Sequence, residues 1–337
     1  MPGTGRANRS VDGGGRPSSA AIAAGLDHAM SASRARPFPW HVIVFLAPAV
    51  LVYTAIMILP LAETLRLSFY SDTETGRTFF AGLDNFRMLF FDDYWSAQFW
   101  NALWNNLWFF VIHMLVQNPV GIALAAILSM THLPGRSFYR TAIFVPAVLS
   151  VVIVGFAWKL ILSPLWGVSI TMLDAVGLKS LFAPWLGKEA YALTALSLIS
   201  VWQFVGIPMM LIYAALLTIP EELVEAAQLD DITGFALFWK IKLPLILPTI
   251  GIISILTFIG NFNAFDLIYA VQGALAGPNY ATDLLGTLLY RTFFGHQLQL
   301  GDPHMGAAVA TVMFLIILTG VMIYLFAVQR RVSRYQF

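Results

Sequence analysis

Long runs of apolar residues dominate this chain, and short polar segments separate them. Six runs reach the roughly 20 mostly apolar residues that an α-helix needs to cross the hydrocarbon core of a bilayer. We predict membrane-spanning helices at 42–61, 103–130, 142–162, 191–217, 245–271 and 307–328. Because backbone polar groups in lipid must be satisfied within the protein, the pattern predicts an all-α membrane protein with about six transmembrane helices.

Composition agrees with a membrane protein and excludes several other classes. Of the 337 residues, 58% are hydrophobic and 11% are charged, whereas a soluble domain carries about 25% charged residues. The chain has no cysteine, which excludes a disulfide framework, a thiolate nucleophile and a cysteine-based metal site. We find no cluster of His, Asp and Glu at metal spacing, and we expect no metal site. A net charge of +1 gives no sign of a nucleic-acid partner, and we expect none.

Basic residues favour one orientation, because cytoplasmic loops carry an excess of Lys and Arg. If six spans alternate, both termini and the segment around Glu225 fall on the basic side, which we predict to be cytoplasmic. The residues that carry this argument are Arg34, Arg36, Arg136, Arg140, Lys240, Lys242, Arg330, Arg331 and Arg334.

A polar, amphipathic island, EAAQLDDITGFALFWKIKLPLILP at 225–248, separates the fourth and fifth predicted spans. Thr218 and Glu221 form a capping-box pattern, and Pro220 suits a first helical turn. Asp230 and Asp231 break this helix, and a second short helix runs from Phe235 to the prolines that follow it. The pattern predicts a helix-turn-helix on the cytoplasmic face.

Acidic residues outnumber basic ones in this island, and this favours a protein partner. The acidic residues are Glu221, Glu222, Glu225, Asp230 and Asp231, against Lys240 and Lys242. The alternative is an amphipathic helix that lies on lipid. The anionic cytoplasmic leaflet would repel these carboxylates, so the partner is the favoured interpretation.

The island and several other motifs, in order along the chain from Pro39, resemble bacterial carbohydrate-type ABC importer permeases. The island resembles their EAA loop, the segment that docks on the ATPase. The other motifs are FLAPAVLVY (45–53), GLDNF (82–86), NALWNN (101–106), RSFYRTAIFVPAVLS (136–150), VWQFVGIPMMLIYAALLTIPEEL (201–223), NAFDLIYAV (263–271) and GAAVA (306–310). The resemblance implies the type I importer fold with both termini cytoplasmic.

By this resemblance, the island couples transport to ATP hydrolysis on a separate subunit. The residues implied in coupling are Glu225, Ala226, Ala227, Asp230, Asp231, Gly234, Phe238 and Pro244. The family has Gly where this chain has Asp231, and Gly adopts positive φ at no steric cost. Either the turn is reshaped, with help from Gly234, or docking tolerates Asp.

Polar residues inside the predicted spans are candidates for a substrate path, since such groups face the bundle or a cavity. They are Asn261, Asn263 and Asp266 in the fifth span, Gln117 and Asn118 in the second, and Gln203 in the fourth. Amides and carboxylates beside Trp and Tyr suit a sugar. The alternative is that these groups only tie helices together. We expect His113 to serve packing and Lys159 to reach the membrane interface. We find no buried Arg, which favours a neutral sugar.

The resemblance also implies partners and a location. We expect a second permease subunit, most simply in a heterodimer, an ATP-binding subunit dimer, membrane lipid, and a periplasmic or lipid-anchored sugar-binding protein facing loop 272–305. The chain would sit in the bacterial cytoplasmic (inner) membrane and import a di- or oligosaccharide or a polyol. No G-x-x-x-x-G-K-[ST] or G-x-S-x-G motif is present, so we expect no catalytic residue or cofactor here, and ATP and Mg²⁺ on the partner. A glycerol-phosphate permease of the same family, a self-contained channel and a membrane enzyme are the alternatives.

The resemblance gives four segments. Residues 1–38, rich in Gly, Ser, Ala and Arg, would be a disordered cytoplasmic tail. Residues 39–100 would hold the first span and a periplasmic loop, and residues 101–328 the ABC transmembrane type-1 permease domain. Residues 329–337 would be a basic cytoplasmic tail.

Overall fold

A computed structural model describes residues 40–73, 75–130, 133–177, 180, 182–297 and 299–329. The tails predicted at 1–38 and 329–337 lie outside the described residues, apart from Gln329. The chain forms two compact units, Met1–Pro60 and Leu61–Phe337, and each is described by itself. In the first unit, α2 (Trp40–Tyr53) continues through the π-helix η1 (Thr54–Ile58). With α3 (Leu59–Leu67), which belongs to the second unit from Leu61 onward, these form an apolar helix of 26 residues, Val42–Leu67, long enough to cross a bilayer.

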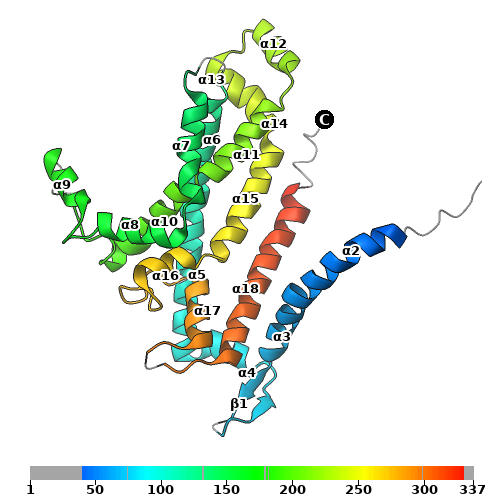
Figure 1. The fold of residues 1–337 in the computed structure, drawn as a ribbon, viewed down its shortest axis with the longest axis vertical. Coiled ribbons are helices and arrows are strands. Elements are labelled where there is room, and N and C mark those ends of the chain that lie inside the picture. Colours follow the sequence, from blue (N-terminus) through cyan, green and yellow to red (C-terminus); the bar gives the residue numbers. More distant parts are fainter. Residues whose placement is uncertain are drawn as a thin grey trace, which may run out of the picture. The chain divides into compact units, whose positions relative to one another are not determined.

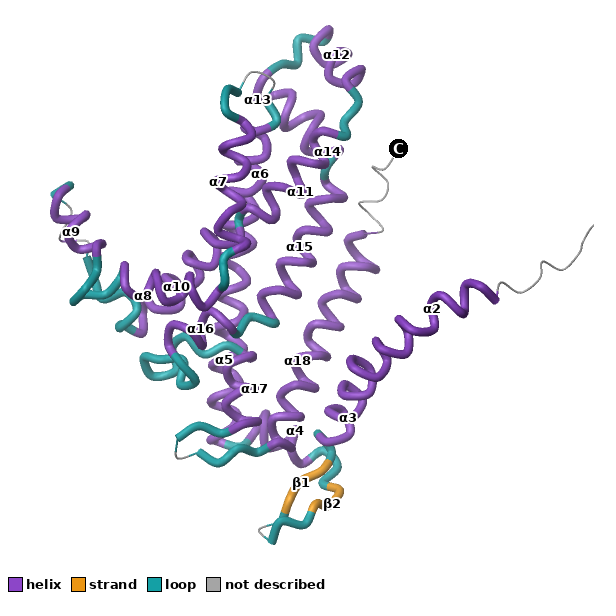
Figure 2. Tube along the Cα trace, in the orientation of Figure 1, coloured by secondary structure: helices purple, strands orange, loops and turns teal. Residues whose placement is uncertain are grey.

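After α3, the second unit contains a small hairpin and a long helix. Strands β1 (Tyr70–Asp72) and β2 (Thr78–Phe80) pair antiparallel, with Tyr70 opposite Phe80. They are the only strands among the described residues (Figure 2). Helix α4 (Asp84–Phe91) follows. Asp92 then caps the next helix by accepting from the backbone N–H groups of Tyr94 and Trp95. That helix contains α5 (Asp93–Ile112), η2 (His113–Gln117) and α6 (Asn118–Leu128), and it spans 36 residues.

Three of the predicted spans are broken helices, which corrects the continuous helices expected from the sequence. Helix α7 (Arg136–Val148) meets α8 (Val151–Ile161) at 97°, and α10 (Glu189–Phe204) meets α11 (Gly206–Leu217) at 41°. The segment Gly234–Leu245 meets α15 (Leu247–Phe262) at 69°. Together with the three long helices, these pairs give up to six spans within the part of the chain that the structure describes.

The fifth span also ends earlier than predicted. Helix α15 stops at Phe262, residues 263–265 are not helical, and α16 (Asp266–Gln272) begins a separate short helix. The break fits closely against the chain that follows it. A Cβ on Gly286 would lie 2.6 Å from the carbonyl oxygen of Ala264. Asn263 and Asp266 therefore lie at an opening in the helix, rather than inside a continuous one as predicted.

The remaining helices complete the second unit, and several of them lie at its two ends (Figure 1). One end carries the polar island, and the other carries α4 and α17. The elements are α9 (Val168–Ala175), α12 (Glu221–Leu229), α13 (Gly234–Leu237), η4 (Phe238–Lys242), α14 (Leu243–Leu245), α17 (Leu285–Phe294), α18 (Pro303–Ile323) and η5 (Tyr324–Gln329).

Three buried apolar clusters hold this unit together, and polar groups lie between them. One cluster packs α4, α5, α17 and α18 around Phe99, Leu288 and Met305. A second packs α8, α10 and α16 around Leu196 and Ile268. The third packs α6, α11 and α15 and includes Met209. The helices that converge between these clusters surround the cavity described next.

Candidate functional site

A cavity of about 390 Å³ lies among the long helix, the α10–α11 pair and the break between α15 and α16. Its walls are mostly apolar, as in small-molecule sites, which occupy about 300–1,000 Å³. The lining residues are Phe109, His113, Gln117, Val151, Ser200, Phe204, Ile207, Pro208, Leu211, Ile253, Leu256, Thr257, Gly260, Asn261, Asn263, Ala264, Phe265, Asp266, Leu267 and Ile268. The helix breaks therefore shape the cavity.

Four of the six predicted path residues line this cavity. Gln117 and Asn261 are each 6% exposed, whereas Asn263 and Asp266 are exposed at the α15–α16 break. The aromatic side chains in the wall belong to phenylalanines at 109, 204 and 265, where Trp and Tyr were predicted. The structure therefore brings together residues from the second and fifth predicted spans that lie about 140 positions apart in the sequence.

Two buried acceptor atoms in the cavity wall have no hydrogen-bond partner among the described residues. These are Oε1 of Gln117 and Oδ1 of Asn261. The Asn261 amide nitrogen is occupied, because it donates to the carbonyl oxygen of Thr257 at 2.7 Å. Leaving a buried acceptor unpaired costs about 1–3 kcal/mol, so each such atom in a native structure needs a reason. Two hydroxyl groups of a ligand, each donating one hydrogen bond, would satisfy both atoms.

The other two predicted path residues, Asn118 and Gln203, do not line the cavity. Asn118 Oδ1 accepts from the Thr257 hydroxyl at 3.3 Å and links α6 to α15. Gln203 Nε2 donates to the carbonyl oxygen of Leu149 at 3.1 Å, where the bend between α7 and α8 frees that carbonyl. Both residues tie helices together, the alternative interpretation of the sequence.

His113 belongs to the cavity, although the sequence suggested only packing. Its Nδ1 donates to the carbonyl oxygen of Phe109 at 2.7 Å, and its Nε2 lies 3.0 Å from the Ser200 hydroxyl. With Nδ1 protonated in the neutral ring, Nε2 accepts from that hydroxyl. The signal available in the sequence was a polar pair, His113 and Ser200, inside two apolar runs; only the fold shows that they meet.

The polar island forms the helix-turn-helix that the sequence predicts, with two corrections. Thr218 does not cap α12, because its hydroxyl donates to the carbonyl oxygen of Ala215 and the N-cap position belongs to Pro220. The second short helix does not end at Pro244 either. Instead, it continues from α13 through η4 and α14 and bends at Ile246, and both Phe238 and Pro244 are half-buried.

Asp231 takes the backbone conformation that a glycine would take. Its φ is +60° and that of Gly234 is +56°. Left-handed backbone is sparsely populated for residues other than Gly, although Asp and Asn tolerate it best. The Asp231 N–H donates to the carbonyl oxygen of Gln228, and the Ile232 N–H to that of Ala227. The structure therefore places Asp231 in a tight turn with left-handed backbone, and its effect on docking stays a prediction.

The exposed surface of the island carries acidic and small residues beside the large apolar side chains of Leu229, Phe235 and Trp239. Glu225 and Ala226 are exposed, as are Asp230, Asp231 and Gly234. Ala227 differs from these, because it is only 5% exposed and packs against its own chain. The face available to a partner therefore includes Glu225, Ala226 and the turn, with exposed Leu229 and Phe235 beside them.

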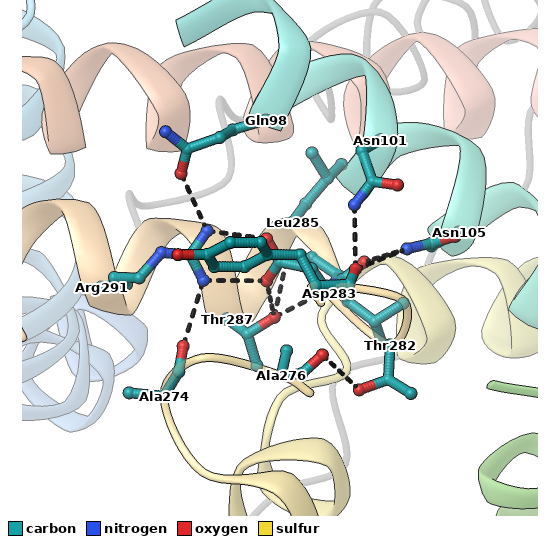
Figure 3. Close-up of polar contacts among 12 residues, drawn as sticks. Gln98, Asn101, Asn105, Ala274, Ala276, Thr282, Asp283, Leu285, Thr287 and Arg291 are labelled. Carbon is teal, nitrogen blue, oxygen red and sulfur yellow. Dashed lines mark hydrogen bonds and ion pairs between the residues drawn. The ribbon is translucent and has the colours of Figure 1, made fainter. Parts of the chain in front are cut away.

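A buried arginine lies at the opposite end of this unit, contrary to the prediction of none. Arg291 on α17 is 1% exposed and pairs with Asp283, whose carboxylate oxygen lies 2.7 Å from the guanidinium (Figure 3). Burial raises the pKa of the Asp283 carboxyl, and hydrogen bonds from Arg291 and Thr287 oppose that rise. Arg291 is absent from the cavity wall, so it does not make the cavity basic.

Comparison with known proteins identifies the family. Residues 117–334 match the model of the binding-protein-dependent transport system inner membrane component family. The chain belongs to this family. It is therefore a multi-pass membrane permease subunit and not an enzyme, and ATP hydrolysis takes place on a separate subunit of the binding-protein-dependent system.

Relatives of this permease align with about three quarters or more of its length. It is 33% identical to the probable ABC transporter permease protein YurN of Bacillus subtilis over 277 residues, 81% of this chain and 91% of the relative. It is also 33% identical to the multiple sugar-binding transport system permease protein MsmF of Streptococcus mutans over 254 residues, 74% of this chain and 83% of the relative.

The fold of the permease also matches a solved importer. A chain of the bacterial alginate ABC transporter, crystallised with an alginate pentasaccharide-bound periplasmic protein, superposes with a TM-score of 0.74. The match covers 87% of the permease and 96% of that chain at 23% identity. The fold predicted from the sequence, that of an ABC type I importer permease, is confirmed.

Proposed function

We propose that this permease carries a neutral sugar, such as a di- or oligosaccharide or a polyol, through the cavity at the α15–α16 break. The observation that carries the proposal is the cavity wall, which is mostly apolar and includes a few polar side chains. The unpaired acceptors of Gln117 and Asn261 would accept sugar hydroxyls, and the phenylalanine rings would cover C–H faces. Several relatives are named as sugar permeases, including MsmF and the arabinooligosaccharides transport permease AraP of Bacillus subtilis.

The charge of the cavity favours a neutral sugar over a phosphorylated one. Among the described residues that line it, Asp266 is the one charged side chain, and it is acidic. A phosphate group would need basic groups or N–H donors along the path. Lys159 lines a different pocket, beside Gln272, and Arg291 is paired with Asp283.

The same proposal assigns ATPase docking to the surface of Glu225, Ala226 and the Asp231 turn. Its carboxylates are exposed and would meet basic side chains of the ATP-binding subunits, which hold ATP and Mg²⁺. To change the ratio of the two conformations of the permease pair from 1:99 to 99:1, a partner must bind one conformation about 5.5 kcal/mol more tightly than the other. The contact at this surface would transmit that difference in binding free energy. We further propose a second permease subunit, a sugar-binding protein on the α17 side, cytoplasmic termini, and a location in the bacterial cytoplasmic membrane.

Co-purification tests the docking proposal. The tagged permease, solubilised gently from its host, should retain an ATPase with a Walker motif and a second permease. Glu225→Lys should lose the ATPase and keep the second permease, because it reverses the charge at the docking surface alone. Glu189→Lys is the matched control, since it makes the same charge change at an exposed position in the first turn of α10. Equal ATPase recovery with Glu225→Lys and wild type would refute the docking assignment.

A further inference from the structure

The loop between α16 and α17, residues 273–284, has a backbone that needs support from its surroundings. Three residues other than glycine have left-handed φ, at +45° for Ala276, +47° for Asn279 and +58° for Tyr280. Such conformations are costly and persist only where neighbouring groups fix them. Leu275 and Tyr280 are nevertheless 38% and 37% exposed, so the loop presents apolar and aromatic side chains to its surroundings.

Arg291 supports this loop from beneath. Its Nη1 donates to the carbonyl oxygen of Ala274 at 3.0 Å, and its Nη2 donates to Asp283 Oδ2 at 2.7 Å. The guanidinium also lies 4.8 Å from the centre of the Tyr280 ring. A single planar cation therefore bonds the start and the end of the loop, as Figure 3 shows, and also contacts the Tyr280 ring in its middle.

Helix α5 fixes the same loop from a second side, through the NALWNN motif. Asn101 Nδ2 donates to the carbonyl oxygen of Tyr280 at 2.9 Å, and Asn105 Nδ2 donates to that of Asp283 at 3.0 Å. These asparagines are four residues apart and so share one helix face. Gln98, on the same helix, accepts from Arg291 at 3.1 Å. The loop is thus bonded to two helices that are far apart in the sequence.

This arrangement is more than the fold needs to connect two helices. A connecting loop at a membrane surface usually satisfies its carbonyl groups with water, whereas this one uses a fully buried ion pair and the side chains of α5. A rigid, pre-shaped surface lowers the ordering cost of binding a partner. Partly exposed Tyr280 supplies an aromatic ring of the kind that is enriched in interface cores.

We propose that Arg291, paired with Asp283, is a positioning residue that holds loop 273–284 in the shape that docks the sugar-loaded soluble binding protein. The proposal rests on the proposed function, which places the binding protein on this side of the permease. Arg291 itself is buried and does not touch the partner. Arg291 therefore affects the concentration of binding protein that is needed to stimulate the ATPase. It does not affect the rate of ATP hydrolysis once the binding protein has docked.

The test uses the whole transporter in lipid nanodiscs and the purified binding protein of the same system. The main variant is Asp283→Leu combined with Arg291→Met, because replacing both partners of a buried ion pair by apolar residues of similar size commonly preserves folding. We expect the concentration of binding protein for half-maximal ATPase stimulation to rise about tenfold. This is the change expected if a loop that is no longer pre-organised binds the partner with a tenfold higher Kd. Basal ATPase activity and the maximal stimulated rate should stay unchanged.

Arg66→Met is the matched control, since Arg66 is an exposed arginine that pairs with Glu63 elsewhere in the chain. It should leave the half-maximal concentration unchanged. An unchanged concentration in the double variant would overturn the proposal. A loss of assembly or of basal ATPase activity in that variant would assign the pair to folding or to contact with the second permease, and would overturn it also.

A second readout keeps loop positioning separate from the proposed function. The chain has no native cysteine, so Leu275→Cys gives a single spin-label site on the loop. The label should be immobile in the otherwise unchanged permease and mobile with Asn101→Ala or with the double variant. If the binding protein fails to stimulate wild type, the proposed function fails, while the label still reports on the loop. Equal label mobility in all three backgrounds would refute positioning by Arg291.

Discussion

Gln117 offers the sharpest test of the cavity, because the two roles open to it predict opposite effects. Its Oε1 is buried and unpaired among the described residues. If a sugar hydroxyl pairs with this atom, Gln117→Met leaves that hydroxyl unpaired in the cavity, at a cost of about 1–3 kcal/mol. The KM for transport should therefore rise about 5- to 150-fold. Since the variant also removes an unsatisfied acceptor, the thermal stability of the permease should stay equal or increase.

The assay is sugar uptake into vesicles that contain the complete transporter, with wild type first screened against di- and oligosaccharides to find the imported sugar. Asn106→Leu is the structural counterpart. Both atoms of the Asn106 amide are bonded inside the chain, with Nδ2 donating to Asn261 O at 3.0 Å and Oδ1 accepting from Leu285 N at 3.2 Å. It should lower stability by about 1–3 kcal/mol. An unchanged KM together with lower stability in Gln117→Met would show that Gln117 only ties helices together.

Two further substitutions test the backbone features of the fold. Asp231→Val should destabilise the island by about 1–2 kcal/mol, because a β-branched residue fits left-handed backbone poorly, whereas Asp231→Gly should be tolerated. We expect faster amide hydrogen exchange at residues 228–234 in the Val variant alone. Equal exchange rates in the two variants would contradict this prediction. Gly206→Ala should lower the melting temperature, because its Cβ would lie 2.8 Å from both the Ile143 carbonyl oxygen and the Phe144 Cα, and such a close contact costs about 1–3 kcal/mol. Gly260→Ala is the control, because nothing lies within 4 Å of its Cβ. Equal melting temperatures for the two variants would contradict the packing of α11 on α7.

Sequence patterns located the helices and the polar island because both depend on local composition. A run of about 20 apolar residues is visible whatever its neighbours are. The turn at Asp231 was also visible, since two acidic residues followed by Thr-Gly rarely continue a helix. The docking role of Glu225 and its neighbours stays a prediction, because no partner contact has been observed.

The breaks within the spans could not be predicted, because they depend on contacts between helices. The bend after Val148 is stabilised by Gln203, which lies 54 residues further along the chain and donates to Leu149. Arg291 looks like an ordinary surface residue in a loop, and only the fold brings Asp283, Gln98 and the Ala274 carbonyl around it. For the same reason, Asn118 and Gln203 could not be separated from Gln117 and Asn261 before the cavity was known.

Crosslinking from the exposed face of α12 tests the central claim most directly. The chain has no cysteine, so Ala226→Cys places a single reactive thiol beside Glu225 on the docking surface. In native membranes, a short thiol-to-amine crosslinker should join this position to a Walker-motif ATPase, and ATP should change the yield. The buried position in Ala227→Cys should react far less. Crosslinks to lipid or to membrane subunits alone, with the ATPase present and never captured, would contradict the account.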